Sequence, residues 1–179
     1  MTVPELVKFL QLAQHITVLT GAGVSAESGI PTFRGPQGLW KAHRPEELAT
    51  PKAFMHDPEL VWEWYDWRRR LVAQCQPNDA HHILARWSQN YSKFTLITQN
   101  VDGLHERTGT ANVINFHSSI WELCCLNRCA ASPDRWVDES VPLSPLPPQC
   151  PSCGRLARPS VVWFGESIDE KVLARSLSS

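Results

Sequence analysis

The sequence TVLTGAGVSAESGIPTFRG, residues 17–35, passes from a β-branched apolar segment into a glycine-rich turn and then into a polar loop. Gly21, Gly23 and Ala26 satisfy the spacing G-x-G-x-x-G/A. In that motif small residues let the backbone approach a pyrophosphate, whose charge lies at a helix N-terminus. We therefore interpret residues 17–35 as a strand followed by a nucleotide-binding loop.

The rest of the dinucleotide fingerprint is missing. An acidic residue should follow about 20 positions later, at the end of a second strand, where it would hold a ribose. Glu46 and Glu47 lie instead in a proline- and charge-containing stretch, and the next strand-like segment begins near Lys93. This long insertion argues against an ordinary dehydrogenase and favours chemistry on the nucleotide itself.

Length and charge set broad limits on the protein. The chain has 179 residues and a formal net charge of -1, which allows one domain with a small module and does not indicate a nucleic-acid or membrane partner. The first 16 residues lack the features of a signal peptide, and no apolar run approaches the roughly 18 residues of a membrane helix. We expect a cytoplasmic protein.

Periodicity predicts an α/β fold with a parallel sheet. The expected strands are residues 16–20, 94–98, 113–116 and 160–164, and the expected helices are residues 4–14, 58–73, 79–87 and 169–177. Asp57 and Asn78 are the expected N-caps of the two middle helices. On helix 58–73 we assign one apolar stripe to the core, formed by Leu60, Trp64, Trp67 and Leu71. The adjacent stripe holds Val61, Tyr65, Arg68 and Val72.

Polar residues follow two of the expected strands. Gln99, Asn100 and Asp102 come after strand 94–98, and ligands of open α/β sheets bind at the carboxyl ends of strands. Asp102 precedes Gly103, so a capped turn is an equally good interpretation of that one residue. His117 follows strand 113–116, where an imidazole can take a proton from a sugar hydroxyl. His105 is the rival for this role.

Five of the six cysteines lie between residues 124 and 153, which in a reducing compartment indicates a metal site. Cys150 and Cys153 form a C-x2-C pair, and Cys125 and Cys129 form a C-x3-C pair 20 residues earlier. These spacings predict structural zinc bound by Cys125, Cys129, Cys150 and Cys153. Cys124 is the alternative to Cys125. Cys75, alone on a helix, is expected to be a small buried residue.

Together these stretches resemble the sirtuins, NAD-dependent protein lysine deacylases. The matching segments are GAGVSAESGIPTFRG (21–35), TQNVDGLHERTG (98–109), FHSSIWEL (116–123), the cysteine pairs and RPSVVWFGE (158–166). The resemblance implies a Rossmann-like domain of residues 1–123 and 158–179, of which only the first half is present, with a helical insertion at about 36–92. It also implies an inserted zinc module of residues 124–157, and acyl-lysine proteins or peptides as substrates.

The resemblance also implies roles for individual residues. His117 would be the general base and, with Asn100, catalytic. Residues 162–165 (Val162, Trp163, Phe164 and Gly165) would pair with the substrate peptide as an added strand. NAD, consumed as a co-substrate, would be bound by Gly21, Ala22, Gly23, Glu27, Phe33, Arg34, Gln99, Asn100 and Asp102. The products would be free lysine, nicotinamide and O-acyl-ADP-ribose.

One pair of residues predicts the acyl preference. Tyr65 and Arg68 lie on one helical face and resemble the Tyr-x-x-Arg of the sirtuin branch that removes succinyl, malonyl and glutaryl groups as well as acetyl. A charge-assisted contact of about 1.5 to 3 kcal/mol would favour acidic acyl groups more than tenfold. The alternative interpretation is that Arg68 is one of three solvated arginines at positions 68–70.

Three features depart from the family pattern. Ser118 follows His117 where the family has glycine, which is costly if that backbone has a positive φ. The first cysteine pair is one residue wider than usual. The second half of the nucleotide-binding fold is not in the sequence, so we expect a fragment or shortened form with weak NAD binding and little activity. Two other functions stay open: transfer of ADP-ribose to a protein, and a non-catalytic fragment that binds partners.

Overall fold

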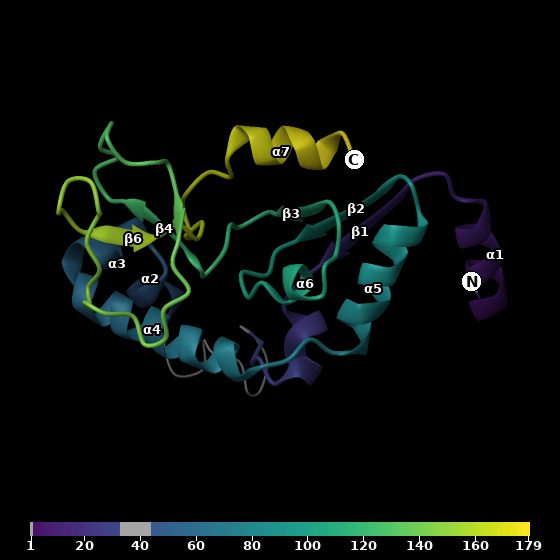
Figure 1. Cartoon of the computed structure of the whole chain (residues 1–179), viewed down its shortest axis with the longest axis horizontal. Helices are drawn as coiled ribbons and strands as arrows, with labels where there is room; N and C mark the ends of the chain where they lie inside the picture. Colours follow the sequence, from purple (N-terminus) through teal and green to yellow (C-terminus); the bar gives the residue numbers. More distant parts are fainter. Residues whose placement is uncertain (1, 33–43) are drawn as a thin grey trace.

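The computed structural model describes residues 2–32 and 44–179 of the chain (Figure 1). Its helices are α1 (Val3–Leu12), α2 (Pro45–Leu48), α3 (Pro51–His56), α4 (Pro58–Gln74), α5 (Asp79–Asn90), α6 (Leu104–Arg107) and α7 (Glu170–Leu177), with a 3-10 helix η1 (Ala22–Ser28). Its strands are β1 (Ile16–Thr20), β2 (Phe94–Thr98), β3 (Val113–Asn115), β4 (Glu122–Cys125), β5 (Trp136–Val137) and β6 (Ala157–Pro159). Among these helices, none has the length and apolar character needed to cross a bilayer.

The first sheet is parallel, as predicted, with the order β1-β2-β3. Thr20 pairs with Thr98, and Thr98 with Asn115, so the three strands end together at one edge. Ile16, Phe94 and Leu96 form a buried cluster beneath the sheet, against which side chains of α1 and α5 pack. This register places the loops after β1, β2 and β3 next to one another.

The second sheet is antiparallel, with the order β5-β4-β6, and carries the cysteines. Helices α3 and α4 lie beside β4 and β6, at the end of the molecule opposite α1 (Figure 1). Phe54 and Trp62 from these helices share a buried cluster with Leu123, Ala157 and Trp163. The Trp62 indole N–H also donates to the Ala157 carbonyl at 3.0 Å. The helices of the insertion and the cysteine sheet therefore share one core.

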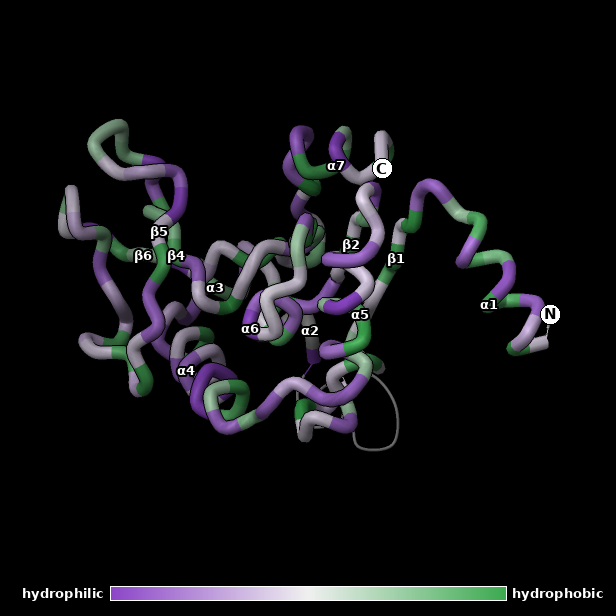
Figure 2. Tube along the Cα trace, turned by 45° about the vertical axis from the view of Figure 1, so that its right-hand side comes forward, coloured by the Kyte–Doolittle hydropathy of each residue, from purple (hydrophilic) through white to green (hydrophobic). Residues whose placement is uncertain are grey.

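Helix α4 begins where the sequence predicts, but it buries the other stripe. Asp57 Oδ1 accepts a hydrogen bond from the Leu60 N–H at 2.9 Å, which confirms the N-cap. Leu60 and Trp67 are 45% and 47% exposed, whereas Val61 and Tyr65 are 0% and 2% exposed. The core assignment was therefore wrong for Leu60 and Trp67, whereas Trp64 is buried and Leu71 is partly buried against a second core cluster. Figure 2 colours α4 largely as hydrophilic, so hydropathy along the helix does not single out one apolar face. Both stripes carry aliphatic and aromatic side chains, and the packing of α4 selects one.

Residues 160–164 do not form the predicted strand. The last strand, β6, is Ala157–Pro159 and pairs with β4. Beyond it the Val162 N–H donates to the His117 carbonyl at 3.2 Å and the Phe164 N–H to the Ala49 carbonyl at 2.9 Å. Because these N–H groups bond to two separate segments, residues 160–164 do not form a continuous hydrogen-bond ladder with one partner strand.

Candidate active site

A cavity of about 560 Å³ opens where the ends of the parallel strands meet α4 and the segment after β6. It brings together most of the predicted site residues from five separate parts of the chain. The residues that line it are Ala22, Gly23, Thr32, Ala49, Trp64, Tyr65, Arg68, Gln99, Asn100, Val101, His117, Val161, Val162, Trp163, Phe164, Gly165, Glu166 and Ile168.

Some predicted residues are not among those lining the cavity. Gly21 immediately precedes η1, and Glu27 is exposed on η1. Asp102 is buried next to η1, where it contacts Ser25. Phe33 and Arg34 lie outside the described residues. The roles of these residues in binding a nucleotide stay predictions.

The glycine loop forms a 3-10 helix, Ala22–Ser28, and not the α-helix start of the dinucleotide motif. Among the described residues, a Cβ atom at Gly21 or Gly23 would meet no neighbouring atom within 4 Å. Packing within residues 2–32 and 44–179 therefore does not require glycine at either position. Since Gly23 lines the cavity, its small size is explained best by a ligand that approaches the backbone closely.

His117 has the geometry of a base. Its Nδ1 lies 3.1 Å from the Gln99 carbonyl oxygen. A carbonyl can only accept a hydrogen bond, so Nδ1 carries the proton and Nε2 holds the free electron pair. His117 lines the cavity, and its imidazole can therefore accept a proton from a molecule bound there.

His105, the rival, lies in a different environment. It is 1% exposed, and its Nε2 lies 3.1 Å from Thr20 Oγ1 below the end of β1. Burial, reinforced by the neighbouring His81 and opposed by Asp102, lowers the pKa of His105 to about 4. His105 is not a lining residue of the cavity, so the structure favours His117.

Ser25 links the strand-end residues, and sequence reasoning did not single it out. Its hydroxyl donates to Asp102 Oδ2 at 2.8 Å and accepts from Asn100 Nδ2 at 3.0 Å. Asp102 Oδ1 accepts from the Leu104 N–H at 2.9 Å, so Asp102 is also the turn cap of the alternative interpretation. Asp102 therefore acts on the cavity through Ser25 and Asn100. In the sequence, Ser25 was indicated only by its position inside the glycine loop.

Tyr65 and Arg68 both line the cavity and are 2% and 5% exposed. The Tyr65 hydroxyl accepts from the Trp163 indole N–H at 2.9 Å, and the Arg68 guanidinium lies 5.0 Å from the Trp64 ring centroid. Burial lowers the pKa of Arg68, with Tyr65 the main opposing influence, but an arginine stays protonated in proteins. Arg68 is therefore a buried cation at the cavity, not a solvated one.

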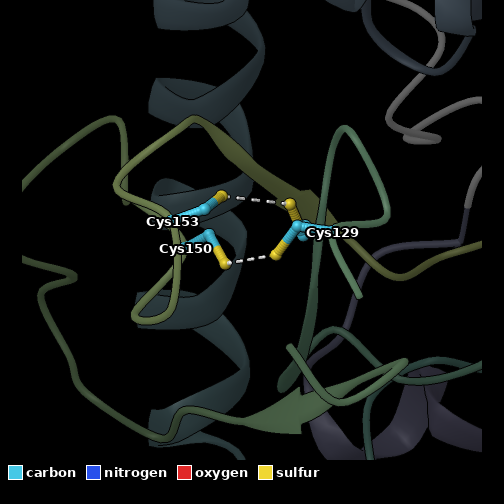
Figure 3. A group of neighbouring side chains, drawn as sticks. Cys129, Cys150 and Cys153 are labelled. Carbon is cyan, nitrogen blue, oxygen red and sulfur yellow. Dashed lines mark hydrogen bonds between the residues drawn. The ribbon is translucent and has the colours of Figure 1, made fainter. Parts of the chain in front are cut away.

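The sulfur atoms of the four predicted cysteines lie close enough together to bind one metal ion. Figure 3 labels three of these residues, Cys129, Cys150 and Cys153. The Cys125 and Cys153 sulfurs, and those of Cys129 and Cys150, are 3.7 Å apart, and all four sulfurs lie within 4.8 Å of one another. Tetrahedral zinc with Zn–S bonds of about 2.3 Å separates its sulfurs by about 3.8 Å. The cluster fits zinc, and Cys124 is not part of it.

The comparisons with known proteins agree with this geometry. The Sir2 family model matches residues 21–178. The NAD-dependent protein deacylase of Aquifex aeolicus (strain VF5) is 53% identical over 90% of this chain and 66% of its own length. NAD-dependent protein deacylase 1 of Caldanaerobacter subterraneus subsp. tengcongensis is 51% identical over 89% of this chain and 64% of its own length. The chain thus spans a little less than two thirds of these relatives.

Solved structures show the same likeness. A Sir2 homologue in complex with NAD has a TM-score of 0.86 and 48% identity, covering 98% of this chain and 67% of that one. A Sir2 variant with a deacetylated p53 peptide and 3′-O-acetyl ADP-ribose has a TM-score of 0.85 and 32% identity, covering 99% of this chain and 72% of that one. With the family model covering most of its length, the chain belongs to the Sir2 family.

Proposed function

We propose that the protein is an NAD-dependent protein lysine deacylase. The observation that carries this proposal is the cavity that places His117 between the glycine loop and the segment 162–165. The names of the relatives and the NAD and peptide complexes of the solved structures support it. NAD would be a substrate, bound with its nicotinamide ribose near Asn100 and His117.

His117 and Asn100 can assist this reaction. The acyl oxygen would attack the anomeric carbon of the ribose, and the bond from that carbon to nicotinamide would break. His117 Nε2 then takes the proton of a ribose hydroxyl as its oxygen attacks the acyl carbon. Water completes the release of lysine and leaves the acyl group on ADP-ribose. Asn100, held by Ser25, has a fixed amide that can orient the ribose.

The peptide would lie along residues 162–165 by backbone pairing. The N–H groups of Val162 and Phe164 bond to His117 and Ala49, and that of Trp163 bonds to Glu166. A substrate strand would therefore pair mainly with the carbonyl groups of this segment. Recognition of backbone atoms would make the enzyme tolerant of peptide sequence.

The zinc ion would have a structural role. The four cysteines would complete its coordination, so no position would be open for a substrate. The ion would hold the loop after β4 against the turn Cys150–Gly154, which the Gly154 N–H closes onto the Cys150 carbonyl at 2.9 Å. Its contribution to catalysis would be to fix the sheet against which α4 packs.

The test is incubation of the protein with NAD and acetyl- or succinyl-lysine peptides, followed by mass spectrometry. We expect free lysine peptide and acyl-ADP-ribose, and a loss of about 10²- to 10⁴-fold in the His117→Ala variant. His82→Ala, at an exposed histidine of α5, is the matched control. ADP-ribose attached to a protein would indicate the transferase instead. Absence of NAD binding in calorimetry would indicate a non-catalytic fragment.

We further propose that Arg68 and Tyr65 select acidic acyl groups such as succinyl, malonyl and glutaryl. A buried guanidinium at the cavity gains a charge-assisted contact with an acyl carboxylate and gains none with an acetyl group.

Substitution at this position tests the preference. We expect Arg68→Met to lower the ratio of succinyl to acetyl turnover by at least about tenfold. Arg70→Met is the control, because Arg70 is two residues further along α4, has a side chain that is 54% exposed, and pairs with Asp66. An unchanged ratio in Arg68→Met would contradict the proposed preference.

A further inference from the structure

Ser118, the residue after His117, has a backbone conformation that costs free energy. Its φ is 67°, in the left-handed region, and it is 3% exposed. This conformation is unfavourable for a residue with a Cβ, and it persists where surrounding contacts hold it. The contacts of the Ser118 side chain must therefore hold this conformation.

The Ser118 hydroxyl lies between two opposite charges. It donates to Glu122 Oε2 at 2.8 Å and accepts from Arg135 Nη1 at 2.9 Å. Arg135 and Glu122 are themselves 3.6 Å apart, and their side chains are 37% and 30% exposed. The serine thus bridges an ion pair with two charge-assisted hydrogen bonds, the stronger class of such bonds.

The bridge joins the His117 loop to the cysteine sheet. Glu122 begins β4, which ends at Cys125, and Arg135 immediately precedes β5. Ser160, which follows β6, has its hydroxyl 3.3 Å from that of Ser118. The segment after it returns to the loop, since the Val162 N–H donates to the His117 carbonyl. Ser118 therefore lies where all three strands of the cysteine sheet meet the loop.

We propose that Ser118 is a positioning residue for His117, acting through Arg135 and Glu122. The bridge holds the loop so that Nδ1 of His117 faces the Gln99 carbonyl and Nε2 faces the cavity. This inference rests on the proposed role of His117 as the base. The orientation of the His117 ring would then depend on a contact with the cysteine sheet, which lies outside the cavity.

Replacing Ser118 by glycine distinguishes a positioning role of its side chain from an effect of backbone strain. Glycine adopts a positive φ freely, so strain alone predicts that Ser118→Gly stabilises the chain and leaves His117 unchanged. Positioning predicts that His117 loses its fixed orientation despite the relief of strain. Arg135→Gln removes the charge on the other side of the bridge and should reproduce the effect. Arg155→Gln, at an exposed arginine of the same module, is the charge control.

Long-range ¹H–¹⁵N NMR of the histidine rings in the full chain reports the pose directly. We expect one tautomer of His117 in the unmodified protein, protonated at Nδ1, and a mixture of tautomers in Ser118→Gly and Arg135→Gln. Turnover should fall about tenfold or more in both variants with the peptide KM unchanged, and the double variant should be no worse than either.

Unchanged His117 signals in both variants, with melting curves showing that they are folded, would overturn the proposal. The NMR measurement does not need turnover. If the unmodified protein lacked deacylase activity, the proposed function would fail while the ring signals still decided the role of Ser118. If Ser118→Gly did not fold, Arg135→Gln and Glu122→Gln would decide it by the same signals.

Discussion

His117 and His105 show how environment separates two residues of one type. Both follow strands of the same parallel sheet, and the sequence offered both as bases. His117 lines the cavity with Nδ1 held by a backbone carbonyl, whereas His105 is buried with a pKa lowered to about 4. A proton acceptor for a bound molecule needs access and a free nitrogen, and only His117 has both.

Tyr65 carries a testable contribution to stability. Its hydroxyl accepts the hydrogen bond of the Trp163 indole, and both side chains are buried. We expect Tyr65→Phe to lower the free energy of unfolding by about 1–3 kcal/mol, because it leaves a buried N–H without a partner. Urea denaturation measures this difference. Tyr91→Phe, at a half-buried tyrosine next to Trp87, should cost less, and an equal cost would contradict the explanation.

Among the elements, the cysteine sheet has very short strands for a sheet that supports two helices. Strand β5 has two residues and β6 has three, yet the sheet supports α3 and α4 through a shared core. Such short strands have few ladder hydrogen bonds of their own. A metal that joins the loop after β4 to the Cys150–Cys153 turn would supply the missing constraint.

Metal removal should therefore disorder this sheet. We expect one zinc per chain by elemental analysis, and we expect a chelator to increase hydrogen exchange in β4–β6 more than in β1–β3. Cys150→Ser should lose the metal. Cys124→Ser should keep it, because neighbouring residues of a strand point to opposite faces and Cys124 is outside the cluster. Metal loss in Cys124→Ser together with retention in Cys150→Ser would refute the assignment.

In the molecule as a whole, a buried polar layer lies at the ends of the parallel strands. Ser25, Asp102, His81 and His105 lie there, each no more than 4% exposed. The layer joins η1, α5 and α6 to the ends of β1 and β2. Its histidines are neutral when buried, so the stability of the fold depends on pH.

The direction of that dependence follows from the shifted pKa values. The pKa of His105 is about 4 in the folded chain and 6.5 ordinarily, so the unfolded chain binds more protons between these values. Burial also lowers the pKa of His81, with Asp102 opposing. The free energy of unfolding should therefore fall as pH drops from 6.5 towards 4, by up to about 1.4 kcal/mol per pH unit from His105, and the lowered pKa of His81 adds a loss in the same direction.

Urea denaturation across this pH range tests the expectation. The slope against pH should be smaller in His105→Gln than in the unmodified protein, since one of the titrating groups is gone. His82→Gln, at an exposed histidine, should keep the slope. Equal slopes in all three proteins would show that His105 does not cause the loss of stability in acid.

Features that depend on local chemistry could be predicted from the sequence. Strands 16–20 and 94–98, the N-caps Asp57 and Asn78 and the cluster of four cysteines agree with the structure, because periodicity, caps and cysteine spacing are local properties. The resemblance of several segments to the sirtuins also indicated the Sir2 family, which the family model confirms.

Where two arrangements were compatible with the sequence, tertiary packing selected one. The sequence could not select the buried stripe of α4, because both stripes carry aliphatic and aromatic side chains and the choice depends on the surface against which α4 packs. It placed Asp102 correctly at the strand end, but the contact with Ser25 needs residues 77 positions apart. The bridge at Ser118 likewise depends on residues in or next to three strands of the other sheet. Such contacts follow from how the elements pack, which no local pattern encodes.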